Sequence, residues 1–539
     1  MTAKQDNVSS ELRKIEQEVD NYYKTNPLLK LPFGVAAWYL LAYYDDLNLI
    51  ELTKTKNNYD ISILADSLVV FLRNPLYWLW TNCAPDGNPP LTYDEHYYDA
   101  CHKISVLAEE YEAFVSAFTY ASQGSEDLEL IGNRIQSKRI WDLRYDAYDR
   151  LVNVVSTIDD QETVELNHKT FYQITNSVKI SGENFSYEFG KRAIEDVIRY
   201  LSRHFTKSFR LPDNWVFNRY SLNDFRKVAK ILTALCFIHM TARNTAAKKG
   251  CVGLGYANSI LIYTKEKLEW NIVRYAGVTQ IVASAIIDDM TYGNRGIKVP
   301  DPAIQPLIRL NKNNYALAPF LLLSSSMERN LTVLLNKIPE ERSQYLKLVD
   351  EKENHMRENL KKNFSSPNSR FYDGNLSDNS LPDIDLAIVS ESEKLVMIFE
   401  LKWFIEPSEQ RETIEKSKEI SKGISQLIKL SNAKSTKPEI LYEVLKVDGT
   451  YNFIFIVVSE NIIGLGSVQN PEIPVINMSH LIKKFKQVQS LIQLSKWLTR
   501  REYLPSENIH FKSVEILSKI GQWEVRWWGH QPLITTEYL

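Results

Sequence analysis

The chain has 539 residues, which is too many for one ordinary hydrophobic core, so we expect two to four domains. Hydrophobic residues make up 44% and charged residues 24% of the chain, a composition typical of folded globular proteins that excludes the disordered and fibrous classes. The formal net charge of −3 excludes a basic field over the whole molecule, so a nucleic acid would have to be held by local patches or by bound metal.

The N-terminus and the cysteines indicate a cytoplasmic protein without membrane contact. Residues 1–20 are polar and mixed in charge, with no apolar stretch that could act as a signal peptide. Of the two most apolar runs, residues 33–44 are too short to span a bilayer and residues 61–80 are interrupted by charges and a proline, so both are predicted to form buried helices. The cysteines form no CxxC pair or Cys/His metal spacing and are expected to be reduced core residues: Cys83, Cys101, Cys236 and Cys251.

The first 340 residues favour helices. Residues 1–160 carry aromatic side chains in apolar clusters at intervals of three and four, which predicts a helical N-terminal region. Residues 163–189 alternate in a way that allows a hairpin, and helical spacing then resumes. We therefore expect a mainly helical middle region over residues 161–340 that binds the substrate or a partner. A protein partner bound through the helical region and a homo-oligomer are both compatible with this organisation.

Two features of the helical region allow a functional or a structural interpretation. Residues 205–227 interleave basic and aromatic side chains, as single-strand or backbone binding of a nucleic acid would require. The same mixture is ordinary where helices pack on loops, and we favour packing. His239 lies in an apolar helix and is expected to be a hydrogen-bonded core residue instead of a metal ligand.

The sequence changes character near residue 340, where we place the main domain boundary. A polar helix leads into a segment rich in Ser, Asn and Asp, and strands begin after it. The predicted elements are a helix over 340–364, strands over 384–389 and 395–401, a helix over 408–431 with Ser408 as N-cap, strands over 451–458 and 475–477, and helices over 480–485 and 487–499. A hairpin, a crossover helix and a buried strand predict a mixed α/β sheet flanked by helices over residues 341–539.

Four polar residues of the predicted hairpin form the candidate catalytic site. Residues two apart on a strand share a face, so Asp383 points with Asp385, and Glu400 points with Lys402. The turn over residues 390–394 folds one strand back on the other, so Asp385 can lie beside Glu400. Two carboxylates at that separation suit Mg²⁺ or Mn²⁺. A lysine on the same face could orient an attacking water or neutralise a phosphoryl oxygen.

An acid followed two residues later by a lysine is also common on solvated strands. Here Glu400 and Lys402 end an apolar run, residues 395–399, where a surface strand would alternate. Asp385 lies upstream across a hairpin of suitable length. This context favours a site over a solvated strand.

The order Asp, hairpin, Glu-x-Lys, helix and apolar strand resembles the PD-(D/E)xK, or restriction-endonuclease-like, superfamily over roughly residues 345–480. The resemblance matches the family's metal-binding Asp to Asp385 and its (D/E)xK motif to Glu400-Leu401-Lys402. Asp383 matches a second acid often found two residues before the first. The resemblance implies a restriction-endonuclease-like α/β domain and a phosphodiesterase, dependent on Mg²⁺ or Mn²⁺, that usually acts on DNA.

The resemblance also implies further site residues on the helices that flank the motif. Many members carry a glutamate on the preceding helix. Glu353 is the best match because apolar residues follow it at helical spacing, and Glu351 and Glu358 are its rivals. Members often carry a polar residue on the helix after the motif, and Gln426 is our choice for a site-facing residue over a solvated position.

The predicted function is Mg²⁺-dependent hydrolysis of phosphodiester bonds by an endodeoxyribonuclease. Asp385 and Glu400 would hold the metal, and Lys402 would orient the water. A basic rim around the site is expected from four lysines: Lys361, Lys362, Lys422 and Lys429. A role in defence against foreign DNA follows from the family alone. The alternative is a scaffold on a nuclease fold that binds nucleic acid or protein without cutting, against which the complete Asp/Glu/Lys set argues.

Overall fold

The structure, a computed structural model, describes residues 3–54, 69–90, 94–122, 126–139, 142–158, 168–182, 184–205, 211–251, 258–405, 407 and 410–533. The chain forms two compact units. Unit 1 contains residues 1–113 and 162–345, and unit 2 contains residues 114–161 and 346–539.

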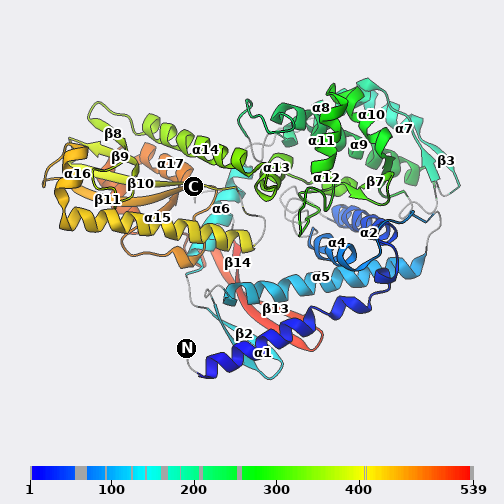
Figure 1. Cartoon of the computed structure of the whole chain (residues 1–539), viewed down its shortest axis with the longest axis horizontal. Helices are drawn as coiled ribbons and strands as arrows, with labels where there is room; N and C mark the ends of the chain where they lie inside the picture. The colour runs from blue at the N-terminus through cyan, green and yellow to red at the C-terminus, as the bar shows by residue number, and fades with distance from the viewer. Residues whose placement is uncertain are drawn as a thin grey trace. The chain divides into compact units, whose positions relative to one another are not determined.

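Unit 1 is mainly helical, as the sequence predicts for this part of the chain (Figure 1). Its helices are α1 (Ala3–Val19), α2 (Phe33–Lys54), α4 (Val70–Asn82), most of α5 (Glu95–Ser122), α7 (His168–Ser177), α8 (Lys191–Phe205), α9 (Leu222–Lys248), α10 (Lys265–Ala276), α11 (Gln280–Asp289), α12 (Pro319–Leu323), α13 (Met327–Lys337) and the first turn of α14 (Arg342–Asn363). Its strands are the pair β3 (Lys179–Ser181) and β4 (Asn184–Ser186), and a small sheet of β5 (Leu261–Thr264), β7 (Asn314–Leu317) and β6 (Ile308–Arg309).

The core of unit 1 is built from the aromatic and aliphatic side chains of α2, α4 and α5. Trp38 and Tyr44 of α2 lie in one buried cluster with Leu76 of α4 and Ile104 of α5. Full burial of an aliphatic or aromatic side chain stabilises a fold by roughly 1.5–3 kcal/mol. The aromatic residues spaced three and four apart in the sequence therefore fold as predicted, on helices.

The hairpin allowed over residues 163–189 forms only in part. Residues 163–167 lie outside the described part of the chain, and α7 follows them as a helix. Thr170 and Ile174 of α7 are buried four residues apart, a helical period that outweighs the alternation. The β3–β4 hairpin occupies the end of the stretch.

The described part of the basic and aromatic stretch, residues 211–227, is used for packing, as favoured from the sequence, and residues 206–210 lie outside the described residues. Trp215, Phe217 and Tyr220 are buried. Arg226 pairs with Asp213 at 2.6 Å. These side chains therefore serve the fold of unit 1.

His239 and the cysteines also lie where the sequence predicts. His239 is buried, with Nδ1 3.0 Å from the Tyr187 hydroxyl and Nε2 2.8 Å from the main-chain oxygen of Asn258. Its pKa is lowered to about 4 by burial, so the ring is a neutral, hydrogen-bonded core residue. The cysteines are free thiols, three of them buried and Cys83 half-buried.

Unit 2 is built around a five-stranded mixed sheet in the order β12–β11–β10–β9–β8. The strands are β8 (Ser369–Gly374), β9 (Ile384–Ser390), β10 (Leu395–Trp403), β11 (Asn452–Glu460) and β12 (Val475–Asn477). The hairpin β9–β10 is antiparallel, and β11 runs parallel to β10, as a crossover requires. The predicted strands of the sheet are therefore confirmed, whereas β8 was not predicted.

Helices cover both faces of this sheet (Figure 1). They are α14, α15 (Gln410–Thr436), α16 (Pro438–Leu445), α17 (Met478–Val488) and α18 (Leu491–Thr499). On one face, Phe364 at the end of α14 stacks on Phe485 of α17 and contacts Phe399 of β10. On the other face, α15 lies against β10 and β11. The predicted N-cap of α15, Ser408, lies outside the described residues.

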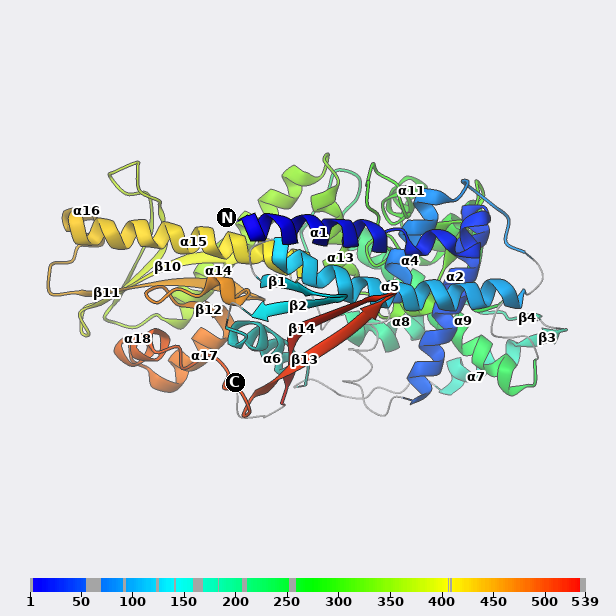
Figure 2. The same cartoon turned by 90° about the horizontal axis from the view of Figure 1, so that it is seen from below.

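A second sheet of unit 2 joins distant parts of the sequence, in the order β1–β2–β14–β13. Its strands are β1 (Glu126–Ile131), β2 (Arg134–Arg139), β13 (Phe511–Ile520) and β14 (Trp523–Pro532). Helix α6 (Arg144–Ile158) lies beside β14 (Figure 2). Because β14 pairs with β2, residues 114–161 group with the C-terminal part of the chain, which differs from the three consecutive regions expected from the sequence.

The architecture is thus mixed α/β with a helical N-terminal region. Among the described residues, no helix combines the length and the apolar character needed to cross a membrane.

Candidate functional site

The residues singled out from the sequence come together where β9 begins and β10 ends. The antiparallel register pairs Phe399 with Leu386, so the next step along the ladder places Glu400 opposite Asp385. Lys402 follows Glu400 on the same face of β10. The hairpin therefore brings both carboxylates and the lysine to the same end of these two neighbouring strands, as predicted.

Short hydrogen bonds fix this constellation. The Leu401 main-chain N–H donates to Oδ2 of Asp385 at 2.7 Å. The Lys402 Nζ donates to Oε1 of Glu400 at 2.6 Å. Glu400 is 3% exposed, whereas Asp385 and Lys402 are half-buried and Asp383 is exposed. The site is thus closed around Glu400 and open toward Asp383.

Burial and mutual repulsion raise the pKa values of the carboxyl groups. Desolvation first, and then the charge of Asp385, raise the pKa of Glu400 to about 7. Burial also raises the pKa of Asp385, although the hydrogen bond from Leu401 and the charge of Lys402 lower it. Desolvation lowers the pKa of Lys402, but the charge and hydrogen bond of Glu400, together with the charges of Glu353 and Asp385, outweigh it and leave a net increase. Simultaneous ionisation of both carboxyl groups is therefore disfavoured here, and a further cation would favour it.

Glu353 on α14 reaches the same strand end. Its Oε1 lies 3.5 Å from the main-chain nitrogen of Trp403, which donates to it. Burial raises the pKa of Glu353, the charge of Lys402 lowers it and that of Asp385 raises it. Its two rivals, Glu351 and Glu358, are exposed, and Glu358 pairs with Lys361. The structure brings Glu353 to the strands.

Arg357 is a site residue that the sequence reasoning missed. Its Nε donates to the main-chain oxygen of Asp385 at 2.8 Å, and its positive charge lowers the pKa of Asp385. Arg357 follows Glu353 by four residues, so the two side chains share one face of α14. That spacing is the signal that could have found it.

Helix α15 contacts the site through a glycine. A Cβ atom at Gly423 would lie 3.0 Å from Cγ of Glu400 and 3.3 Å from Cε of Lys402. Gln426, three residues later, is half-buried on the same side of the helix. On this helix Gln426 was predicted from the sequence as a site-facing residue, whereas Gly423 was not predicted.

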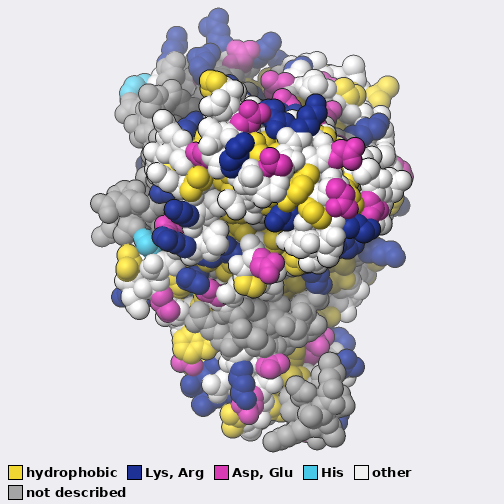
Figure 3. All heavy atoms as spheres, turned by 90° about the vertical axis from the view of Figure 1, so that its left-hand side faces the viewer, with side chains coloured by type: hydrophobic (Ala, Val, Ile, Leu, Met, Phe, Trp, Pro, Cys, Tyr) yellow, Lys and Arg dark blue, Asp and Glu magenta, His cyan; other side chains and the backbone are white. Residues whose placement is uncertain are grey.

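The lysines predicted to form a basic rim are mostly paired with local acids or point into solvent. Lys361 pairs with Glu358 at 3.0 Å and with Asp373 at 2.9 Å, and Lys422 pairs with Glu419 at 2.6 Å. Lys362 and Lys429 are exposed. On the face drawn in Figure 3, basic and acidic side chains are interspersed. Arg357 is the arginine that contacts the site directly.

The chemistry of the site suits a hard divalent cation. Mg²⁺ prefers oxygen ligands and keeps several waters, so one or two protein carboxylates are enough to hold it. Asp385 and Glu400 supply such a pair. Within the described part of the chain, no group of three or more His, Cys, Asp or Glu side chains is arranged as a metal site. By the chemistry of their oxygen donors, Asp385 and Glu400 would fit a two-carboxylate Mg²⁺ site completed by water.

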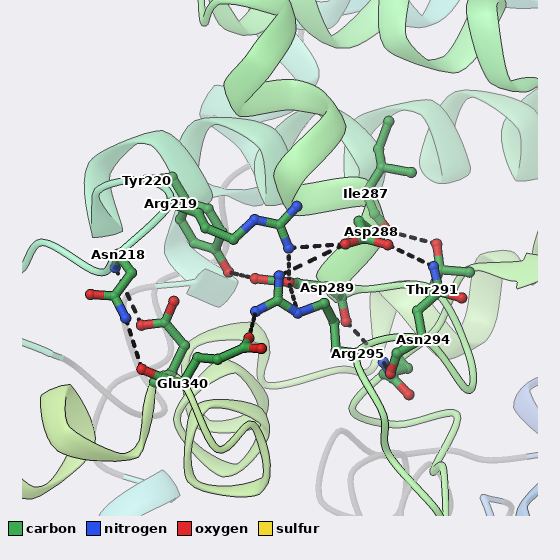
Figure 4. Close-up of polar contacts among 12 residues, drawn as sticks. Asn218, Arg219, Tyr220, Ile287, Asp288, Asp289, Thr291, Asn294, Arg295 and Glu340 are labelled. Carbon is green, nitrogen blue, oxygen red and sulfur yellow. Dashed lines mark hydrogen bonds and ion pairs between the residues drawn. The ribbon is translucent and has the colours of Figure 1, made fainter.

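A second polar cluster lies in unit 1, where Arg219 and Arg295 converge on Asp288 and Asp289 at the end of α11 (Figure 4). Arg219 Nη1 lies 2.9 Å from Asp288 and 2.8 Å from Asp289. The Tyr220 hydroxyl donates to Asp289 at 2.7 Å. Asp289 is 1% exposed, and burial raises its pKa to about 6.

This cluster connects segments of unit 1 that are distant in the sequence. Arg295 also pairs with Glu340 at 2.6 Å, and the Asn218 amide donates to the main-chain oxygen of Glu340 at 2.8 Å. Each arginine thus has carboxylate partners within the unit. We interpret the cluster as part of the fold.

Comparison with known proteins adds no relative to this picture. The chain matches no protein-family model, no curated protein and no solved structure. What the candidate site can do therefore follows from its own geometry.

Proposed function

We propose that unit 2 contains a Mg²⁺-dependent nuclease of the restriction-endonuclease-like type that hydrolyses phosphodiester bonds of DNA, with a role in defence against foreign DNA. The observation that carries the proposal is the buried Glu400, hydrogen-bonded by Lys402 and facing Asp385 across two strand ends. A carboxylate 3% exposed at the end of an apolar strand is costly to the fold. A functional demand accounts for that cost.

Each side chain has a role in this proposal. Asp385 and Glu400 hold the cation, which when bound would activate water and stabilise charge on the phosphate. Lys402 donates a hydrogen bond from its ammonium to Glu400 and would neutralise a phosphoryl oxygen. Glu353 raises the negative charge beside Lys402, and Arg357 holds the backbone of Asp385. Gln426 is proposed to contact the substrate.

A scaffold that binds nucleic acid or protein without cutting is the alternative. The exposed rim lysines and the absence of a three-residue metal group among the described residues are compatible with it. The complete set of two carboxylates and a lysine at one point favours the enzyme, because a binding protein has no need of a buried, partly uncompensated Glu400.

The test is cleavage of supercoiled plasmid by the purified full chain with Mg²⁺, with EDTA added as a control. We expect nicking that EDTA abolishes. Lys402→Ala should retain the fold by circular dichroism and lower the cleavage rate by about 10²- to 10³-fold, because charge stabilisation in the transition state is lost. Lys347→Ala, at an exposed position on α14 outside the predicted rim, is the matched lysine control and should cut within a few-fold of the wild-type rate. Equal rates for Lys402→Ala and wild type would leave the scaffold as the better explanation.

A further inference from the structure

Gly423 lies at the middle of α15, where this helix contacts the end of β10. A Cβ atom at this position would lie 3.0 Å from Cγ of Glu400 and 3.3 Å from Cε of Lys402. Favourable carbon–carbon contacts lie at about 3.5–4.0 Å, so a methyl group would not fit without moving one of these side chains. Any other residue type at this position would therefore push these side chains away by a few tenths of an ångström.

A glycine at this position is unfavourable for the helix itself. Glycine in a helix interior is less stable than alanine because its backbone loses more freedom on folding. Ile420 and Ile424 beside it are buried and give α15 its apolar face. The close approach of α15 to Glu400 and Lys402 is therefore the physical reason for glycine here.

We propose that Gly423 is a positioning residue for the Glu400–Lys402 pair. Both side chains pack against the backbone of Gly423, and this close contact limits their rotamers. Lys402 Nζ then stays 2.6 Å from Oε1 of Glu400. The catalytic role of this packing contact rests on the proposed nuclease function, whereas the contact itself does not.

The strand ends cannot move away to relieve an added methyl group without other losses. Glu353 accepts a hydrogen bond from the Trp403 main chain, and Arg357 donates to the main-chain oxygen of Asp385. Both partners belong to α14. An alanine at position 423 would therefore displace the side chains of Glu400 and Lys402 and leave the backbone of β10 in place.

The first measurement is plasmid cleavage by Gly423→Ala in the full chain with Mg²⁺. We expect a cleavage rate about tenfold lower with little change in KM, because a displacement of a few tenths of an ångström at reacting groups should cost less than the roughly 10²-fold loss typical of a 1 Å misplacement. Ser425→Ala is the control on the same helix: Ser425 is exposed and its hydroxyl bonds only to the Ser421 main chain in the described contacts. It should cut at the wild-type rate.

The second measurement is thermal unfolding in a double-mutant cycle, which needs no activity. Gly423→Ala should lower the melting temperature of the wild type. In Glu400→Ala it should lower the melting temperature less, or raise it, because Cγ of residue 400 is gone and the gain in helix propensity is then opposed only by the contact with Cε of Lys402, near the flexible end of its side chain. Equal shifts in both backgrounds would show that the contact has no energetic consequence and would overturn the proposal. Unequal shifts with wild-type cleavage by Gly423→Ala would also overturn it, because positioning would then be irrelevant to the reaction.

The two arms separate this inference from the proposed function. If the wild type cuts no DNA under any metal condition, the nuclease proposal fails, and the melting temperatures still decide whether Gly423 positions the pair.

Discussion

Glu400 is a buried carboxylate whose neighbours compensate its charge only in part. The Lys402 ammonium lies 2.6 Å from Oε1 of Glu400 and contributes one positive charge. The carboxylate of Asp385 on the neighbouring strand repels the charge of Glu400. An unbalanced buried charge lowers the stability of a fold, and such groups cluster at functional sites for that reason. Glu400 therefore has a predictable effect on the dependence of stability on pH.

Glu400→Gln should change the pH profile of unfolding. The pKa of Glu400 is raised from 4.5 to about 7 in the folded protein, so its contribution to stability is present below about pH 4.5 and is lost as pH rises through 7. Glutamine stays neutral, so the variant should lose less unfolding free energy between pH 4.5 and pH 8 than the wild type. Chemical denaturation at several pH values measures this. Parallel profiles would mean that Glu400 titrates normally and that its burial has no electrostatic cost.

The sequence identified Asp385, Glu400 and Lys402 because their spacing on two strands is a recognisable pattern. Arg357 and Gly423 were missed for different reasons. Arg357 acts through the main-chain oxygen of Asp385, a contact that leaves no motif. Gly423 matters through the space around it, which depends on how closely a helix packs on a strand.

At the scale of elements, α14 and α15 determine how the strand ends are held. The hairpin β9–β10 and the strand β11 were predicted from apolar runs and a polar turn, signals that are local in sequence. The strand β8 was not, because residues 369–374 are mostly half-buried, contain only two neighbouring aromatic residues among polar ones and a glycine, and form the edge of the sheet. Edge strands carry little apolar signal.

Arg357→Lys tests how α14 holds the site. Lysine keeps the positive charge but has no Nε–H to donate to the Asp385 main chain at 2.8 Å. We expect a cleavage rate about tenfold lower with an unchanged melting temperature, since looser groups at a reaction centre are less effective. Arg370→Lys is the control, because Arg370 also donates to main-chain oxygens, those of Leu445 and Lys446. Wild-type cleavage by Arg357→Lys would show that only the charge of Arg357 matters.

Substitutions in the polar cluster of unit 1 should lower stability, in contrast to Arg357→Lys, because the role of this cluster is structural. Asp289→Ala removes the acceptor of the Tyr220 hydroxyl and of Arg219, and should lower the unfolding free energy by about 3–5 kcal/mol. Asp289→Asn keeps an acceptor and the neutral form that the raised pKa favours, so it should cost less. Urea denaturation measures both. Equal losses would indicate that the charge of Asp289, not its hydrogen bonds, holds the cluster together.

At the scale of the whole molecule, the main difference from expectation is that residues 114–161 belong with the C-terminal part of the chain. Val525 of β14 pairs with Ile135 of β2, and both are buried. Phe511 of β13 clusters with Ala147 of α6. Pairing between segments nearly 400 residues apart has no local signature, and patterning within either segment could not predict it.

The unit boundary leads to a prediction about fragments. A chain of residues 346–539 alone keeps the β9–β10 site but lacks β2 and α6, so Val525 and Phe511 lose their covering partners. Tolerance of truncation depends on the burial and hydrogen bonding of the affected backbone. We expect the amides of residues 524–526 to exchange with solvent faster in the fragment than in the full chain, with the amides of β10 nearly as protected as before. Hydrogen exchange read by mass spectrometry distinguishes the two regions. Undiminished protection over β14 in the fragment would mean that the β13–β14 hairpin is stable by itself and that β2 and α6 pack on it without being needed.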